Sequence, residues 1–403
     1  MPPNDATHEL IRRIHASPER AVISVTGGGS LAISRLLCVP GASQTVLEAR
    51  VPYSQAALND WLGFTPEQAC ASATSRAMAM AGYRRAEFLA SRERERPESS
   101  SKRYPSPPTP LPQRERGEDA FPVVGLGLTA SLASDRPKRG AHRIHLAAQS
   151  ANCTWSQSVE LTKGARSREE EESLTAALLI DLLAEVCGIA DRPTVGLRPE
   201  ENLERRRTDA PLAWQELLAG RLQCVEARPI IDRRECPVGI FPGSFNPEHE
   251  GHRQMRRIAE KKLGGPVDYE ISIENVGKLP LDFEDMAKRA KQFDSPLFFT
   301  SAPRMVQKAR LFPGRTIVCG LDTITRVADV KFAEGSEAER DRTIEEIAAL
   351  GCRFLVFGRA TPQGFRTLDD LELPPALRAI CEGVSEAEFR ADVSSTELRK
   401  QAE

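Results

Sequence analysis

The chain has 403 residues, with 55 Lys and Arg against 57 Asp and Glu, and its formal net charge is −2. This balance gives no overall electrostatic attraction to nucleic acid or to a membrane surface. The nine cysteines include no Cys-x-x-Cys pair, which argues against a disulfide scaffold and a zinc site. No apolar run approaches the ~20 residues of a membrane span, and residues 1–19 lack a signal-peptide pattern, so we expect a cytoplasmic protein.

The length predicts two to three domains, and the first 190 residues alternate apolar strands with amphipathic helices, which predicts an α/β domain. A strand at 21–25 leads into the turn Gly27-Gly28-Gly29 and a helix that ends near residue 37. Such a turn offers backbone N–H groups to an anion, although tight-turn geometry alone also explains it. The other expected elements are helices at 8–15, 53–62, 66–89 and 167–187, and strands at 45–51, 122–128, 143–148 and 154–161.

The same region resembles the C-terminal domain of CinA-type proteins, the nicotinamide-nucleotide amidases. The matching residues are Ser24-Val25-Thr26-Gly27-Gly28, Val39-Pro40-Gly41-Ala42-Ser43, and Tyr53-Ser54 with Leu62-Gly63 beyond. The resemblance implies an α/β/α fold and places Ser24 at the position of the family's proposed nucleophile. The amidase-like site that it implies consists of Ser24, Thr26, Gly27, Gly28 and Tyr53.

Three departures from that family predict a degenerate amidase site. Ile23 replaces an acidic residue, Leu58 replaces a lysine, and residues 127–132 replace a Thr-Gly-x-x-Gly-Pro loop. A serine is inert at neutral pH without a base or a lowered pKa. We therefore expect a domain that keeps the fold, binds a phosphate weakly through its glycine turn, and hydrolyses little or nothing. The alternative for Ser24 is a buried hydroxyl at the end of a strand.

Two irregular stretches divide the chain. Residues 91–119 alternate Arg with Glu and end in a proline-rich run, which predicts a disordered insertion or a polyproline ligand for a partner protein. Residues 191–233 are charged and irregular apart from an expected helix at 212–222, and we interpret them as a linker and a junction helix. A second domain is then predicted over residues 234–403.

The second domain opens on the strongest motif in the chain. An apolar strand at 238–242 is followed by a loop and by a helix that begins near Gly251. The loop and helix start read Gly243-Ser244-Phe245-Asn246-Pro247-Glu248-His249-Glu250-Gly251-His252. A helix N-terminus directs N–H groups at phosphate, and His249 and His252 can donate hydrogen bonds as charge develops there. The alternative is two surface histidines beside a helix start.

This motif resembles the signature of the HxGH nucleotidylyltransferase superfamily, which includes nicotinamide-mononucleotide adenylyltransferases and cytidylyltransferases. The resemblance implies a Rossmann-like domain with a parallel sheet. It implies attack of a substrate phosphate on the α-phosphate of a nucleoside triphosphate, release of pyrophosphate, and Mg²⁺ as a helper. It also implies that Gly243, Ser244 and Phe245 contact the nucleotide.

Strands are expected further on at 268–273, 297–300, 316–319, 353–357 and 389–393, with a helix at 283–293. Lys278 follows the first of these strands and resembles a phosphate-binding lysine of the adenylyltransferases, or else is a solvated loop residue. Asp322 lies in Gly320-Leu321-Asp322-Thr323, which resembles their Gly-x-Asp-Thr segment, where the Asp contacts the nucleotide or the metal. The alternative for Asp322 is an ordinary helix cap.

A last motif lies near the C-terminal end of the sequence. Ser394-Ser395-Thr396-Glu397-Leu398-Arg399 resembles the Ile-Ser-Ser-Thr-x-x-Arg segment of the same superfamily. Ser394, Ser395 and Thr396 would offer hydroxyl and N–H groups at a helix start, and Arg399 would face the same phosphates one turn later. The alternative is an ordinary capping box.

Together these motifs predict a nucleotidylyltransferase that works by positioning and charge stabilisation, with His249, His252 and Arg399 in catalytic roles. ATP is the first choice of donor and nicotinamide mononucleotide the first choice of acceptor. One alternative is CTP with a phosphorylated alcohol, and another is a catalytically silent nucleotide sensor. We expect Mg²⁺ as cofactor and small-molecule nucleotides as partners, with no nucleic acid or membrane, and self-association into a homo-oligomer stays open.

Overall fold

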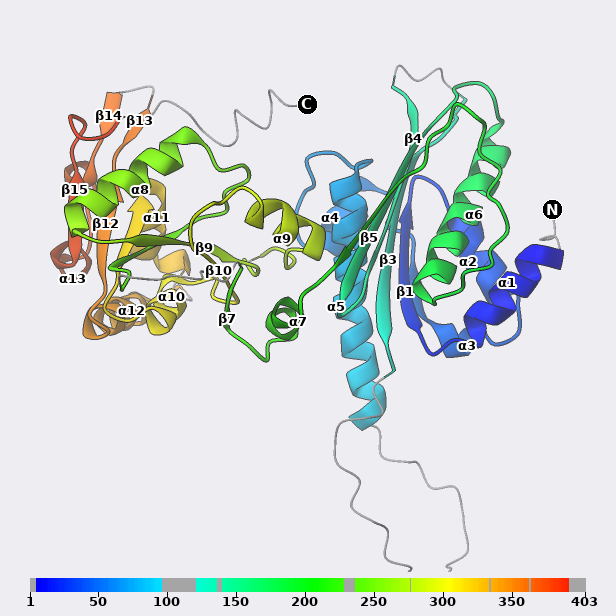
Figure 1. Ribbon diagram of the computed structural model, residues 1–403, viewed down its shortest axis with the longest axis horizontal. Helices are drawn as coiled ribbons and strands as arrows, with labels where there is room; N and C mark the ends of the chain where they lie inside the picture. The colour runs from blue at the N-terminus through cyan, green and yellow to red at the C-terminus, as the bar shows by residue number, and fades with distance from the viewer. Residues whose placement is uncertain are drawn as a thin grey trace, which may run out of the picture. The chain divides into compact units, whose positions relative to one another are not determined.

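The computed structural model describes residues 5–95, 121–135, 140–227, 236–275, 277–332, 335–361 and 364–390. It divides the chain into two compact α/β units, which Figure 1 draws with their elements labelled. Unit 1 comprises Met1–Pro211 together with Gly277–Glu284, and unit 2 comprises Leu212–Val276 and Asp285–Glu403. Most of the expected insertion, from residue 96 on, lies outside the described residues. Within the described ranges, no helix is both long enough and apolar enough to cross a bilayer.

Unit 1 contains a six-stranded sheet in the order β2-β1-β3-β4-β5-β6. Strand β1 pairs in parallel with β2 and β3, and the remaining neighbours pair antiparallel. The strands are β1 (Arg20–Thr26), β2 (Val46–Arg50), β3 (Val123–Ser131), β4 (His142–Gln149), β5 (Cys153–Leu161) and β6 (Glu204–Asp209). Side chains are buried almost continuously along β1 and β3, which shows that both faces of the sheet are covered.

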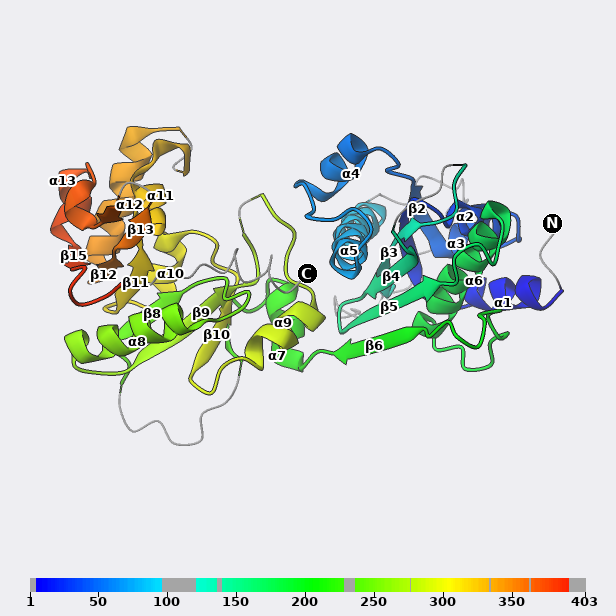
Figure 2. The same ribbon diagram turned by 90° about the horizontal axis from the view of Figure 1, so that it is seen from above.

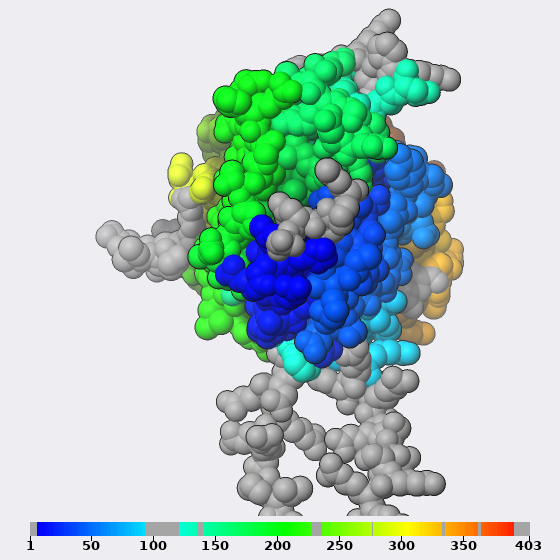
Figure 3. Space-filling model, turned by 90° about the vertical axis from the view of Figure 1, so that its right-hand side faces the viewer, coloured from blue at the N-terminus to red at the C-terminus, as the bar shows by residue number. Residues whose placement is uncertain are grey.

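Helices cover both faces of this sheet. The long helix α5 packs on one face, while α1, α2 and α6 pack on the other around the main apolar core. Figure 3 looks onto the second face, where the dark-blue helix α1 lies at the surface beside the green part of the chain. The helices are α1 (Asp5–His15), α2 (Ser30–Leu37), α3 (Ala42–Thr45), α4 (Gln55–Leu62), α5 (Ser72–Glu95) and α6 (Arg168–Val186).

Two glycines of β3 allow α5 to lie directly on the sheet. A Cβ atom at Gly127 would lie 2.1 Å from the carbonyl oxygen of Ser75, and one at Gly125 would lie 2.0 Å from that of Ala79. Both obstacles are helix backbone, which no side-chain rotation relieves. Glycine is therefore required at these positions by close packing, not by an unusual backbone angle.

Three expectations for unit 1 are wrong. Residues 91–95, which were expected to begin the insertion, are the last residues of helix α5. The helix expected from residue 66 begins at Ser72, because the carbonyls of Gln68 and Ala69 accept hydrogen bonds from the side chains of Thr74 and Thr129. The linker expected from residue 191 includes β6, which pairs with β5 along its whole length. Strand β6 is charged and exposed because it forms the edge of the sheet, and edge strands commonly carry such residues.

Unit 2 contains a seven-stranded sheet in the order β15-β12-β11-β8-β9-β10-β7, in which only β7 is antiparallel to its neighbour. The strands are β7 (Cys224–Glu226), β8 (Gly239–Pro242), β9 (Val267–Ser272), β10 (Leu297–Thr300), β11 (Thr316–Gly320), β12 (Arg353–Phe357) and β15 (Cys381–Val384). A separate hairpin joins β13 (Arg359–Thr361) to β14 (Gly364–Arg366). The parallel sheet that the sequence predicted is thus present, while Phe389 and Arg390 of the last expected strand are not in a strand.

Helices again lie on both faces of the sheet, as Figure 2 shows from above. Helix α8 covers the face that carries Phe241 and Tyr269, and α10 to α13 cover the face that carries Ile240 and Ile317. The helices are α7 (Leu212–Leu218), α8 (Glu250–Leu263), α9 (Phe283–Ala290), α10 (Met305–Leu311), α11 (Leu321–Ala328), α12 (Glu337–Ala349) and α13 (Pro375–Ala379), with short 3₁₀ turns η1 (Val330–Phe332) and η2 (Leu368–Asp370). Helix α9 begins in the segment that is grouped with unit 1.

Candidate functional site

The His-x-Gly-His loop of unit 2 lies where the strand order of the sheet reverses. Strand β8 is central, and the chain passes from it to β9 and β10 on one side, while β11, β12 and β15 follow on the other. In open parallel sheets of this kind, ligands bind beyond the carboxyl ends of the strands at such a switch point. The loop after β8 and Asp322, which follows β11, come from the two strands that flank it.

The loop rests on an aromatic floor. Phe245 has a φ of 41° and is buried, and its ring contacts Phe241, Tyr269 and Phe293 at centroid distances between 5.1 and 5.4 Å. The imidazole of His252 packs edge-on against the same ring at 4.9 Å. Gly243 is needed beside it, because a Cβ atom there would lie 2.6 Å from the Phe245 ring. The ring of Phe245 therefore helps to orient His252, and its contact with a nucleotide stays a prediction.

The two imidazoles stack on each other at the start of α8. Their centroids are 3.7 Å apart with an interplanar angle of 23°, and the backbone N–H of His249 donates to Nδ1 of His252 at 3.3 Å. Burial, and secondarily His249, lower the pKa of His252 to about 3. Burial likewise lowers the pKa of His249, with Glu248 opposing the shift. Both rings are therefore neutral at pH 7, and His252, which accepts through Nδ1, carries its proton on Nε2 as a hydrogen-bond donor.

Side chains that the sequence did not single out hold this loop in place. Arg289 donates to the carbonyl of Ser244 at 2.6 Å, and Gln292 both donates to the carbonyl of Phe245 and accepts from the N–H of Glu248. The carboxylate of Glu248 accepts from the hydroxyl of Tyr269 at 2.8 Å. The local sequence pattern does not predict these contacts, because the partners lie 21 to 47 residues apart in sequence.

The remaining residues that were predicted to bind the nucleotide lie in different parts of the chain. Asp322 lies in the first turn of α11, where it is exposed and paired with Arg359. Lys278 is exposed, and its segment is grouped with unit 1, whereas the histidines belong to unit 2. The serine, threonine and arginine motif (Ser394, Ser395, Thr396 and Arg399) lies outside the described residues.

The expected Mg²⁺ has no ready-made protein site. In the part of the chain that the structure describes, no three His, Cys, Asp or Glu side chains are grouped so that they could hold a metal ion. Mg²⁺ bound to a triphosphate uses one or two carboxylates besides the phosphates. The resemblance implies that Asp322 contacts either the nucleotide or the metal, and in the structure its carboxylate is paired with Arg359.

In unit 1 the hydroxyl groups of Ser24 and Thr26 are bonded to backbone carbonyls. Ser24 is fully buried, and its hydroxyl donates to the carbonyls of Leu126 at 3.1 Å and Met78 at 3.4 Å. Thr26 donates to the carbonyl of Pro52 at 2.9 Å, and Tyr53 is exposed. Leu58, at the position of the family's lysine, packs in an apolar cluster with Leu62 and Met78. The buried hydroxyl that was the alternative for Ser24 is what the contacts support.

The glycine turn of unit 1 already holds an anion, namely the carboxylate of Glu172 from α6. Its two oxygens accept from the N–H groups of Gly29 at 2.8 Å and Leu31 at 3.0 Å, and from the hydroxyl of Ser30 at 3.1 Å. Behind the turn, Gly27 has a φ of 75° and its carbonyl accepts from Arg168. The binding of phosphate by the turn stays a prediction, and a ligand there would compete with the carboxylate of Glu172 for the N–H groups of Gly29 and Leu31.

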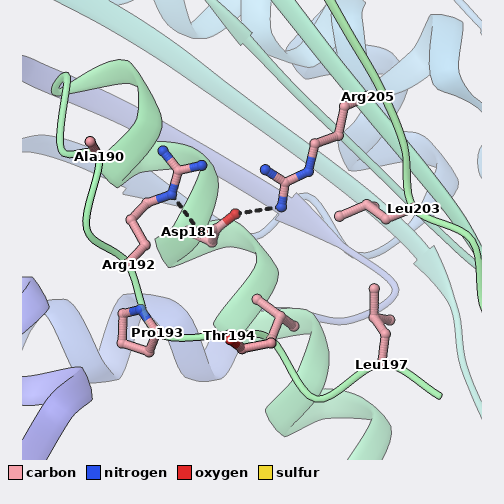
Figure 4. Close-up of a pocket in the computed structure, with 9 residues that line it drawn as sticks. Asp181, Ala190, Arg192, Pro193, Thr194, Leu197, Leu203 and Arg205 are labelled. Carbon is pink, nitrogen blue, oxygen red and sulfur yellow. Dashed lines mark hydrogen bonds and ion pairs between the residues drawn. The ribbon is translucent and has the colours of Figure 1, made fainter. Parts of the chain in front are cut away.

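A cavity in unit 1 lies elsewhere, between the end of α6 and the chain that leads into β6. It has a volume of about 340 Å³, and its walls include Arg192 and Arg205, both paired with the buried carboxylate of Asp181 (Figure 4). Glu185 contacts the same two guanidinium groups. Two carboxylates thus balance two guanidinium groups, and none of the predicted site residues that the structure describes is part of the wall.

Comparisons with known proteins give limited similarity. The sequence matches no known protein family and no curated protein. Among solved structures, the chain is similar to a competence/damage-inducible protein from Agrobacterium tumefaciens, with 20% identity over 46% of this chain and 98% of that one and a TM-score of 0.32. It is also similar to competence-damaged protein (CinA) superfamily proteins from Escherichia coli and Klebsiella pneumoniae, each with 12% identity and a TM-score of 0.30 over 45% of this chain, covering 88% and 98% of those chains.

Glu172→Ala should destabilise the protein by about 1–3 kcal/mol, because it leaves the N–H groups of Gly29 and Leu31 without their charged acceptor. The free energy of unfolding in denaturant measures the loss. Glu169→Ala is the matched control, since it removes an exposed carboxylate from the same first turn of α6. Equal losses in the two variants would contradict the assigned role of Glu172.

The buried imidazole of His252 should make stability depend on pH. Its pKa is about 3 in the fold against about 6.5 in an unfolded chain, so between these values the unfolded state binds more protons. The free energy of unfolding should therefore fall as the pH drops from about 6.5 towards 3. Above about pH 6.5 the ring is neutral in both states, so His252 should cause no pH dependence there. Unfolding in denaturant at pH 7.5 and pH 5 measures the difference, which His252→Asn should reduce. An unchanged pH dependence in the variant would count against the neutral buried ring.

Proposed function

We propose that unit 2 is a nucleotidylyltransferase that transfers a nucleoside monophosphate from a nucleoside triphosphate to a phosphate acceptor and releases pyrophosphate. The observation that supports the proposal is the stacked, neutral His249 and His252 at the N-terminus of α8, beyond the carboxyl end of the central strand. A helix N-terminus favours phosphate, and a switch point is where an open sheet receives its ligand.

The chemistry follows from the protonation state of these rings. A group with a pKa of about 3 is a poor base at neutral pH, so His252 acts as a hydrogen-bond donor and not as a proton acceptor. An oxygen of the acceptor phosphate forms the new bond to the α-phosphorus, and the bond to the bridging oxygen breaks as pyrophosphate leaves. The imidazoles donate to the α-phosphate oxygens, where charge develops, and need no reorganisation because Phe245 and the backbone fix them.

We propose ATP as donor and nicotinamide mononucleotide as acceptor. The support is the resemblance of the Gly-x-Asp-Thr segment around Asp322 to the adenylyltransferases, and the presence on the same chain of a region that resembles the nicotinamide-nucleotide amidases. CTP with a phosphorylated alcohol would use the same histidines. A single assay panel that pairs each triphosphate with each class of acceptor therefore distinguishes ATP from CTP as the donor.

Purified full-length protein with Mg²⁺, ATP and nicotinamide mononucleotide should form the dinucleotide and release pyrophosphate, which a coupled assay measures. His252→Ala should lower turnover by about 100-fold, as loss of one preorganised donor does. His8→Ala is the matched control, because it removes an imidazole in unit 1. If no triphosphate yields pyrophosphate with either class of acceptor, the transferase assignment fails.

We propose in addition that unit 1 is a degenerate amidase-like domain. The support is that the hydroxyl of Ser24 is buried and bonded to two carbonyls, neither of which can act as a base. The full chain should release little or no ammonia from nicotinamide mononucleotide, and Ser24→Ala should not change the rate. Robust ammonia release that the Ser24→Ala variant loses would show that the domain is an active hydrolase.

A further inference from the structure

A short acidic segment whose sequence neighbours lie in unit 2 is embedded in unit 1. Gly277–Glu284 is grouped with unit 1, although Val276 and Asp285 on either side belong to unit 2. Leu279 packs against the apolar cluster of Leu58 and Met78, and the N–H of Phe283 donates to Oγ1 of Thr154 at 3.0 Å. The backbone of the segment is therefore seated on α5 and β5 of unit 1.

Two carboxylates of the segment enter a polar cradle, which we define as Arg76, Thr154, Ser156 and Arg206. Asp282 accepts from Nε of Arg76 at 2.9 Å, and both groups are at least nine-tenths buried. Glu284 accepts from the hydroxyl of Ser156 at 2.6 Å and lies 3.5 Å from Arg76 and 3.6 Å from Arg206. Guanidinium groups, hydroxyl groups and a fixed geometry are the usual elements of a phosphate or carboxylate site.

The charge balance of the cradle depends on the segment. With the segment in place, the guanidinium groups of Arg76 and Arg206 face the carboxylates of Asp282 and Glu284, and Glu204 lines the same small cavity as Arg206. Removing the segment takes the two carboxylates of Asp282 and Glu284 away from these guanidinium groups. A cavity of about 90 Å³, lined by Ser72, Ser156, Ser158, Glu204 and Arg206, adjoins the cradle and provides room for a group larger than a carboxylate.

Attachment of the segment to the rest of unit 1 does not by itself explain why charged residues are used. A buried ion pair costs desolvation that often cancels its attraction, so apolar residues would fasten the segment equally well. Directional donors that converge on two carboxylates are instead typical of ligand recognition. We propose that Asp282 and Glu284 are an internal ligand of an anion site in unit 1, and that the site binds a small molecule bearing a phosphate group when the segment is released.

The experiment uses inorganic phosphate as probe on the full-length protein that carries Asp282→Asn and Glu284→Gln together. These substitutions remove the two charges that hold the segment in the cradle, so the segment should be released more readily and phosphate should supply the missing anion. Thermal unfolding should show a saturable rise of the melting temperature of about 3 °C or more with phosphate, relative to potassium chloride at equal ionic strength. The unsubstituted protein should respond much less.

Adding Arg76→Gln to the double variant should abolish the response, which separates the cradle from any phosphate bound in unit 2. If that combination does not fold, Arg206→Gln replaces it, because Arg206 is exposed and should weaken the response. If the double variant itself does not fold, Glu284→Gln alone is used. The proposal is overturned if phosphate and chloride act alike on the charge-removed protein, or if the phosphate response is unaffected by both arginine substitutions.

Discussion

The N–H groups at the start of a helix need an acceptor, and the two units differ in the side chains that they place beside these groups. In unit 1, Glu172 reaches from α6 to the glycine turn before α2 and accepts from two of these donors. In unit 2, the start of α8 is framed by His249 and His252, two neutral rings that carry donors of their own. The first helix start is occupied by a carboxylate of the protein itself, and the second is the one to which we assign phosphate binding in the proposed transferase.

The same contrast extends through unit 1. Carboxylates of the chain itself pair with the donors at two positions, Glu172 at the glycine turn and the Asp282 and Glu284 pair at Arg76. The hydroxyl of Ser24 is likewise turned to backbone carbonyls. Each group is satisfied internally, which favours stability over reactivity, because a polar group that is already paired gains little from a ligand.

Much of this architecture could be predicted from sequence where the signal is local. The strands at 297–300 and 353–357 match the structure at both ends, and the loop from Gly243 to the start of α8 was found from its residues alone. Contacts between residues far apart could not be predicted, because neither periodicity nor turn chemistry encodes them. Glu172 lies 143 residues from Gly29, and Arg76 lies 206 residues from Asp282. Strand β6 was missed for another reason, since a charged edge strand has the composition of a linker.

The division of the chain also bears on how such a protein could arise or be rearranged. Unit 1 is not one continuous stretch of sequence, because eight residues of it, Gly277–Glu284, are encoded within the stretch that otherwise forms unit 2. A fusion or exchange at a single point near Pro211 would transfer an incomplete unit 1 and leave behind residues that pack against Leu58 and Arg76. Transfer of a complete unit 1 would therefore have to include the chain as far as Glu284.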